Sequence, residues 1–148
     1  MILRYSVGGA TMADMIRQVD YYYVQVPDRP GEGYKILSEL RRAGVNLLAY
    51  CGFPAGRGKS QLDFAPEDIE TFKKTARKMG LKLSDRKRAF LVQGEDRPGA
   101  LADIAERLAS QDISIIAEQA ACAGAGRWGM ILWVSPADYR KASKALGV

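Results

Sequence analysis

Two short acidic loops contain the residues whose types and spacing could bind a ligand. Asp28-Arg29-Pro30-Gly31 recurs 68 residues later as Asp96-Arg97-Pro98-Gly99, each time between a strand-like and a helix-like run. The start of a helix presents free N–H groups and a partial positive charge, which can hold a carboxylate. The glycine lets a ligand approach the backbone closely, and the aspartate can face an ammonium group. The pattern therefore predicts a site for a small zwitterion such as an amino acid.

Two further polar residues join this predicted site, one in each copy. Asn46 carries both a donor and an acceptor, and Ser114 occupies the corresponding place in the second copy. The predicted ligand-binding residues are Asp28, Pro30, Gly31, Asn46, Asp96, Pro98, Gly99 and Ser114. The alternative is structural: each aspartate would cap its own helix, and Asn46 would make a turn or edge hydrogen bond.

The composition argues against catalysis and against a metal site. The chain has no histidine, the commonest general base and metal ligand, and only two cysteines. No serine, cysteine or threonine can therefore pair with a histidine base, and a zinc site would need carboxylates that do not cluster. We expect no enzyme activity, no cofactor and no metal. Cys51 and Cys122 are expected to be small buried residues in a reducing compartment, which favours the cytoplasm.

The similarity between the two halves extends well beyond the acidic loops. Val24, Gln25, Ile36, Leu40 and Ala49 recur at the same offset of 68 as Val92, Gln93, Ile104, Leu108 and Ala117. Ala55-Gly56-Arg57 recurs at an offset of 70 as Ala125-Gly126-Arg127. The change of offset predicts a two-residue insertion between Ala117 and Ala125. The chain is therefore a tandem duplication of a small domain.

Each copy is expected to contain strands and helices in the order β-α-β-β-α-β. In the first copy the expected strands are Tyr21–Val26, Val45–Tyr50, Ser60–Phe64 and Leu81–Leu83, with helices after Pro30 and Pro66. In the second copy the strands are Ala89–Gln93, Ile113–Gln119 and Gly129–Val134, and the helices are Gly99–Ser110 and Ala137–Leu146. The second copy lacks its fourth strand, and we expect Ile2–Val7 to fill this place. Ala13–Val19 is expected to be a short helix.

Together, the element order and the Asp-x-Pro-Gly loop give a unit that resembles the ACT domain, a family of small-molecule-binding regulatory modules. The matching residues include Gly44-Val45-Asn46-Leu47 after the first helix and Asp112-Ile113-Ser114-Ile115 in the second copy. The resemblance implies an α+β fold of two ferredoxin-like βαββαβ domains, with antiparallel sheets and helices on one face. Residues 1–20 would be an N-terminal extension, 21–86 the first ACT-like domain and 87–148 the second, without its C-terminal strand.

The resemblance implies a non-enzymatic regulatory protein that binds a small molecule, with an amino acid as the expected ligand. Such a module needs an output, so we expect a homodimer or a complex with a regulated enzyme or transcription factor. A protein-protein interaction module without a ligand is one alternative. An RNA-binding module is another, because the net charge is +5 and eight basic residues lie between Lys73 and Arg88; a solvated helix face explains this run better. No segment approaches the ~20 apolar residues that span a bilayer.

Overall fold

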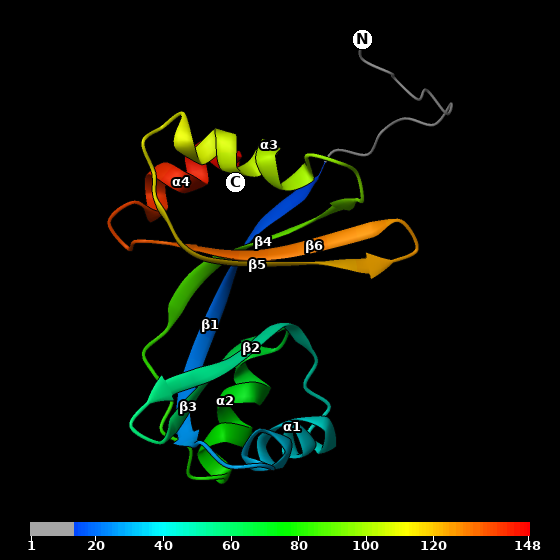
Figure 1. The fold of residues 1–148 in the computed structure, drawn as a ribbon. Coiled ribbons are helices and arrows are strands. Elements are labelled where there is room, and N and C mark those ends of the chain that lie inside the picture. The colour runs from blue at the N-terminus through cyan, green and yellow to red at the C-terminus, as the bar shows by residue number, and fades with distance from the viewer. Residues whose placement is uncertain (1–13) are drawn as a thin grey trace. The chain divides into compact units, whose positions relative to one another are not determined.

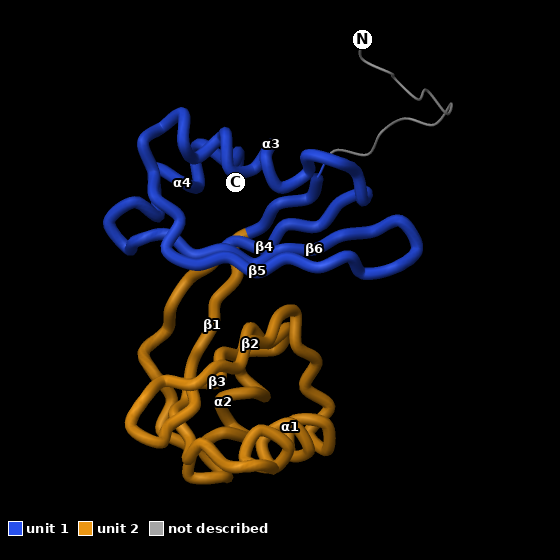
Figure 2. Tube along the Cα trace, in the orientation of Figure 1, with its two compact units in different colours: residues 1–17, 90–148 blue, residues 18–89 orange. Residues whose placement is uncertain are grey.

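The structure, a computed structural model, describes residues 14–148, which belong to two compact units (Figure 2). Unit 2 comprises Gln18–Ala89 and contains the first copy of the repeat. Unit 1 comprises Phe90–Val148 together with residues 14–17, and contains the second copy. Each unit combines antiparallel strands with two helices (Figure 1). The α+β fold expected from the sequence is confirmed.

Unit 2 is a sheet with both helices packed on one face. Its elements are β1 (Met15–Pro27), α1 (Glu32–Arg42), β2 (Leu47–Gly56), β3 (Lys59–Pro66) and α2 (Ile69–Lys78). The strand order is β2-β3-β1, and both pairings are antiparallel. Alternate residues of the strands meet the inward residues of both helices in one core, whose largest members are Tyr22, Ile36, Leu40, Leu62, Phe64 and Phe72. Burial of this shared face holds the helices on the sheet.

Unit 1 repeats the plan with β4 (Lys87–Glu95), α3 (Ala100–Ala109), β5 (Ile115–Gly124), β6 (Arg127–Val134) and α4 (Tyr139–Leu146). β4 pairs with β6 and β6 with β5, all antiparallel. Phe90, Ile104, Leu108 and Leu132 are fully buried in its core. The first residues of β1 belong to this unit: β1 is the neighbour of β4 in the strand order, and Ile16 packs against the same core. They occupy the edge that the second copy leaves without a fourth strand.

Two predicted elements are wrong, both because pairing partners outweigh local pattern. Ala13–Val19 is not a helix: from Met15 the chain is already in β1. Leu81–Leu83 is not a strand, although both leucines pack against the core of unit 2. There the Ser84 N–H donates to the Tyr23 carbonyl at 2.9 Å and the Tyr23 N–H donates to Ser84 Oγ at 3.0 Å. This segment thus lies alongside β1 without forming a regular ladder. The predicted strand Ile2–Val7 lies outside the described residues.

The predicted insertion between Ala117 and Ala125 is also wrong. The hairpin glycines Gly56 and Gly58 have φ of 78° and 68°, and Gly124 and Gly126 have 79° and 69°. The Asp28 N–H donates to the Gly58 carbonyl, as the Asp96 N–H does to Gly126. The offset is therefore still 68 in both hairpins, and the Ala-Gly-Arg match was coincidental. The extra residues lie between β6 and α4, because the N-cap Asp68 follows β3 sooner than the N-cap Asp138 follows β6.

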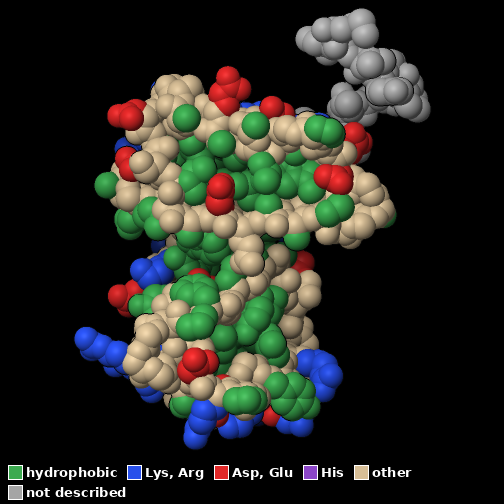
Figure 3. Space-filling view, viewed as in Figure 1, with side chains coloured by type: hydrophobic (Ala, Val, Ile, Leu, Met, Phe, Trp, Pro, Cys, Tyr) green, Lys and Arg blue, Asp and Glu red, His purple; other side chains and the backbone are tan. Residues whose placement is uncertain are grey.

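Charge is unevenly divided between the two units. Unit 2 carries 14 Lys and Arg against nine Asp and Glu, and Figure 3 shows the basic side chains gathered on it. The net charge of +5 is that of unit 2, and eight of the 14 basic residues of this unit lie in the run from Lys73 to Arg88. Among residues 14–148, no helix has the length and apolar character that crossing a bilayer requires.

Candidate functional site

Both acidic loops start a helix in the same unusual way. Gly31 and Gly99 are the N-cap residues of α1 and α3 and are left-handed, with φ of 90° and 86°. A side chain would be strained there, so glycine is required by the backbone. No side chain caps either helix. The alternative in which Asp28 and Asp96 cap their own helices is therefore wrong, and the carboxylates are available for other contacts.

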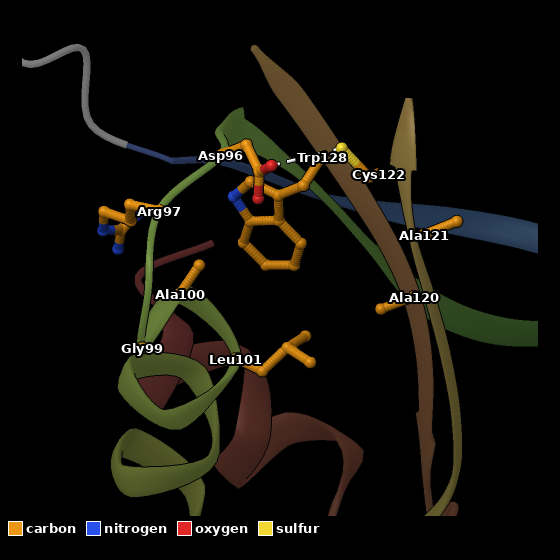
Figure 4. A pocket seen from close by; sticks show the side chains of 9 residues that line it. All are labelled: Asp96, Arg97, Gly99, Ala100, Leu101, Ala120, Ala121, Cys122 and Trp128. Carbon is orange, nitrogen blue, oxygen red and sulfur yellow. Dashed lines mark hydrogen bonds between the residues drawn. The ribbon is translucent and has the colours of Figure 1, made fainter. Parts of the chain in front are cut away.

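In unit 1 the loop borders a cavity of about 260 Å³ between α3 and the hairpin of β5 and β6 (Figure 4). Its lining residues are Asp96, Arg97, Gly99, Ala100, Leu101, Ala120, Ala121, Cys122 and Trp128. Small side chains from β5 leave the space open. Trp128 is buried, with 5% of its surface exposed, and Leu101 is half exposed. The cavity therefore offers apolar walls next to the start of a helix whose first-turn amides lack intrahelical acceptors.

The Asp96 carboxylate lies at the rim of this cavity. Its Oδ2 accepts a hydrogen bond from the Cys122 thiol at 3.1 Å, and the two side chains point toward one another in Figure 4. Cys122 is exposed, so the prediction that it is buried is wrong, whereas Cys51 is buried as expected. The error has a simple cause: Cys122 lies on β5, an edge strand in which only Ile115 packs against the core and every later residue is exposed.

The other charged lining residue, Arg97, is held by other groups. Its Nη1 and Nη2 donate to the two carboxylate oxygens of Asp14, both at 3.2 Å, and Nη2 also donates to Asp103 Oδ2 at 2.7 Å. These hydrogen bonds raise the pKa of Arg97, and the bonds to Asp14 have the largest effect. Figure 4 shows the guanidinium extending away from Leu101 and Trp128. Asp96 is thus the charged side chain best placed to meet a ligand.

In unit 2 the same loop has different surroundings. Asp28 Oδ1 accepts a hydrogen bond from Ser60 Oγ at 2.8 Å. Gly33 stands where the second copy has Leu101, and a Cβ there would lie 3.2 Å from the Tyr50 hydroxyl. The side chain of Leu62 also lies beside this glycine. Tyr50 and Leu62 thus occupy space next to the first turn of α1.

Asn46 and Ser114 lie at the other ends of the helices. Asn46 follows α1, donates from Nδ2 to Glu67 Oε2 at 3.1 Å and accepts from the Glu67 N–H through its carbonyl. It borders a shallow hollow of about 380 Å³ with Leu37, Leu40, Arg41, Gly44, Val45 and Leu47. Ser114 is exposed, just before β5. Of the eight predicted residues, the structure brings Asp96 and Gly99 to the cavity in unit 1, with Pro98 between them in the loop. It places Asn46 and Ser114 elsewhere.

Sequence reasoning missed seven of the nine cavity residues. Three of them adjoin the predicted loop residues, namely Arg97, Ala100 and Leu101, and four lie in the β5–β6 hairpin, namely Ala120, Ala121, Cys122 and Trp128. The one sequence signal for the hairpin side of the cavity is the run of small residues near the end of β5. Such a run indicates a weak strand and does not by itself predict a binding site. Within residues 14–148, no three histidine, cysteine or acidic side chains come together as a metal ion would require.

Comparison with known proteins identifies the fold. No protein-family model matches the sequence, and no match was found among curated proteins. Among solved structures, protein BT0572 from Bacteroides thetaiotaomicron is similar over 89% of this chain and 88% of its own, with a TM-score of 0.76 and 15% identity. The ligand-free regulatory subunit of aspartate kinase from Thermus thermophilus is similar over 94% of this chain and 97% of its own, with a TM-score of 0.65 and 15% identity. The corresponding subunit from Thermus flavus gives 0.58 and 19%, over 94% and 97% of the two chains. The chain therefore has the ACT-like, ferredoxin-type α+β fold of these regulatory subunits.

Proposed function

We propose that this protein is a non-enzymatic regulatory protein that binds a small molecule, an amino acid, in the cavity of unit 1. One observation carries the proposal: a cavity of about 260 Å³ adjoins both the uncapped start of α3 and the Asp96 carboxylate. The two units serve as tandem ACT-like domains. The aspartate kinase regulatory subunits of the same fold support a regulatory role.

The chemistry of the cavity matches the parts of an amino acid. The ligand carboxylate would accept from the first-turn amides of α3, where the helix dipole favours negative charge. The ammonium would donate to Asp96, which already accepts a hydrogen bond from Cys122. Leu101 and Trp128 would receive an apolar side chain. The volume is below the ~300–1,000 Å³ typical of drug-sized ligand pockets, which favours a ligand as small as an amino acid.

Regulation needs a partner that responds to the ligand. We propose that the protein acts in the cytoplasm as a homodimer, or in a complex with an enzyme or transcription factor that it regulates. An interaction module without a ligand is the rival function. The RNA-binding alternative has one supporting observation, the basic surface of unit 2, and it predicts binding that weakens steeply with salt.

A thermal-shift screen against the twenty amino acids tests the proposal. A ligand at 100 times its dissociation constant stabilises the folded state by about 2.7 kcal/mol, which raises the melting temperature. Ala120→Phe should abolish the shift because Ala120 lines the cavity and its side chain points into it in Figure 4. Ala117→Phe adds the same side chain to the opposite face of β5, in a stretch of regular pairing and outside the cavity lining, and is the matched control.

The outcome separates the two functions. A shift with one or a few amino acids that Ala120→Phe removes and Ala117→Phe preserves supports binding in this cavity. No shift with any amino acid at millimolar concentration favours the interaction module.

A further inference from the structure

The strongest polar cluster of unit 1 lies behind the acidic loop and joins it to the beginning of β1. Asp14 makes a two-point ion pair with Arg97, and its side chain is 94% buried, with 6% exposed. Arg97 also donates from Nη1 to the Glu95 carbonyl at 3.4 Å and pairs with Asp103 on α3. One guanidinium therefore connects three parts of unit 1: the residue before β1, the loop and the first turns of α3.

Glycine at position 94 makes room for this carboxylate. A Cβ built on Gly94 would lie 1.9 Å from Asp14 Oδ1 and 2.9 Å from Trp128 Nε1, which are impossible contacts. The first copy has Val26 at the corresponding position, where the side chain is buried in the core of unit 2. Val26 of the first copy thus corresponds to Gly94 of the second, and the Asp14 carboxylate occupies the space that a side chain at position 94 would take.

The Trp128 indole links this cluster to the cavity. Its ring lines the cavity, while Nε1 is buried next to Gly94 and has no hydrogen-bond partner among the described residues. Asp14 lies on the same side of Gly94. The cluster therefore touches two walls of the cavity, the loop through Arg97 and the indole through the packing around Gly94.

The first copy lacks an equivalent arrangement. The counterpart of Arg97 is Arg29, whose side chain is 69% exposed. It pairs at 3.3 Å with Glu32, the first residue of α1. Exposed pairs of this kind contribute little, because solvent screens them and both side chains lose freedom. Arg97 instead pairs with a carboxylate that is 83 residues away in sequence and almost completely buried.

We propose that Asp14 is a positioning residue for the ligand site: through Arg97 it holds the Asp96–Gly99 loop in the conformation that keeps the cavity open. This inference rests on the proposed function of the cavity. The beginning of β1 thereby controls ligand affinity without contacting the ligand. A purely structural role is the competing explanation, in which Asp14 only fastens the start of β1 to unit 1.

Amide hydrogen exchange of the whole chain tests the positioning role without any ligand. Three amides report on the loop, because Asp96, Ala100 and Asp103 donate to Gly126, Arg97 and Gly99 respectively. In Asp14→Asn these three amides should exchange about tenfold faster, the effect expected from losing one charge-assisted hydrogen bond. The corresponding amides of Asp28, Glu32 and Lys35 in the first copy are internal references and should not change.

Two further variants and one control sharpen the test. Gly94→Ala displaces the Asp14 carboxylate and the edge of the Trp128 indole without changing any charge. It should speed the exchange of the same three amides at least as much, which covers the case that Asp14→Asn folds poorly. Arg97→Lys keeps the charge but loses the two-point contact, so combining it with Asp14→Asn should add little further effect. Arg29→Lys, the matched change in the first copy, should leave the exchange of all these amides as in the wild type.

Ligand affinity, measured by calorimetry with the amino acid found in the screen, completes the test. Asp14→Asn should weaken binding about tenfold. A lower melting temperature with unchanged loop exchange and unchanged affinity would overturn the proposal, because Asp14 would then only fasten β1. If the wild type binds no amino acid, the proposed function fails, yet the exchange experiment still decides whether Asp14 positions the loop.

Discussion

Removing the charge of Asp96 tests most directly whether the cavity binds an ammonium group. Asp96→Asn keeps the size of the side chain, and its amide oxygen can still accept from the Cys122 thiol. The variant loses only the negative charge. Asp96 does not cap α3, so the melting temperature without ligand should stay close to that of the wild type. Any loss of affinity then reports on the contact with the ligand.

The expected loss follows from the kind of hydrogen bond that is replaced. A hydrogen bond to a charged group contributes about 1.5–3 kcal/mol and a neutral one about 0.5–1.5 kcal/mol. Because Asp96 is exposed to solvent, the lower end applies, and the difference is about 1 kcal/mol, or roughly fivefold in affinity. The difference should shrink as salt is added, since ions screen exposed charges.

Isothermal titration calorimetry with the stabilising amino acid measures this loss. Asp28→Asn is the matched control in the first copy, where the carboxylate accepts from Ser60 instead, and it should bind as tightly as the wild type. Equal weakening by both variants would refute the assignment of the site to unit 1. Unchanged affinity in Asp96→Asn would refute the pairing of Asp96 with an ammonium group.

Three further predictions concern the stability of the scaffold. Leu108→Ala should lower the free energy of unfolding, measured in urea, by about 2–5 kcal/mol, because Leu108 is fully buried in the core of unit 1. Gly99→Ala should cost about 1–2 kcal/mol in the same assay because alanine is strained at a φ of 86°, and Gly31→Ala should behave alike. Asp68 accepts hydrogen bonds from the Thr71 hydroxyl and N–H, which lower its pKa below 3.8. A carboxylate whose pKa is lowered by folding stabilises the folded state at neutral pH, and this stabilisation is lost as the pH falls below 3.8. Asp68→Ala should therefore lower the melting temperature at pH 7 and have little effect at pH 2.

The sequence predicted the elements that the local pattern determines. Proline and glycine mark the start of α1 and α3, and the apolar spacing of Ile104 and Leu108 correctly places both in the core of unit 1. Leu101 stands one helical turn before Ile104 and fits the same spacing, yet it is 48% exposed and lines the cavity. A core residue and an exposed residue beside a cavity can share the same helical spacing, and only the three-dimensional structure distinguishes them.

The errors share a different cause, which is partners distant in the sequence. The first residues of β1 read locally as a helix, but β4 offers them an unpaired edge in unit 1. Asn46 was predicted to bind the ligand because it carries both a donor and an acceptor; it lies at the opposite end of α1 from Gly31, and its contact with a ligand stays a prediction. The Asp14–Arg97 ion pair spans 83 residues, and a single sequence contains no pattern that predicts such a pair.

The two copies of the loop have different surroundings, and those of the second copy form a cavity. Both copies keep the same four loop residues and the same left-handed glycine. Around the first, Tyr50 packs against Gly33 and Asp28 is bonded to Ser60. Around the second, small residues of β5 leave space, and Gly94 admits a buried carboxylate behind the loop. The cavity is therefore formed by the residues that surround the motif, and transplanting the loop alone would not reproduce it.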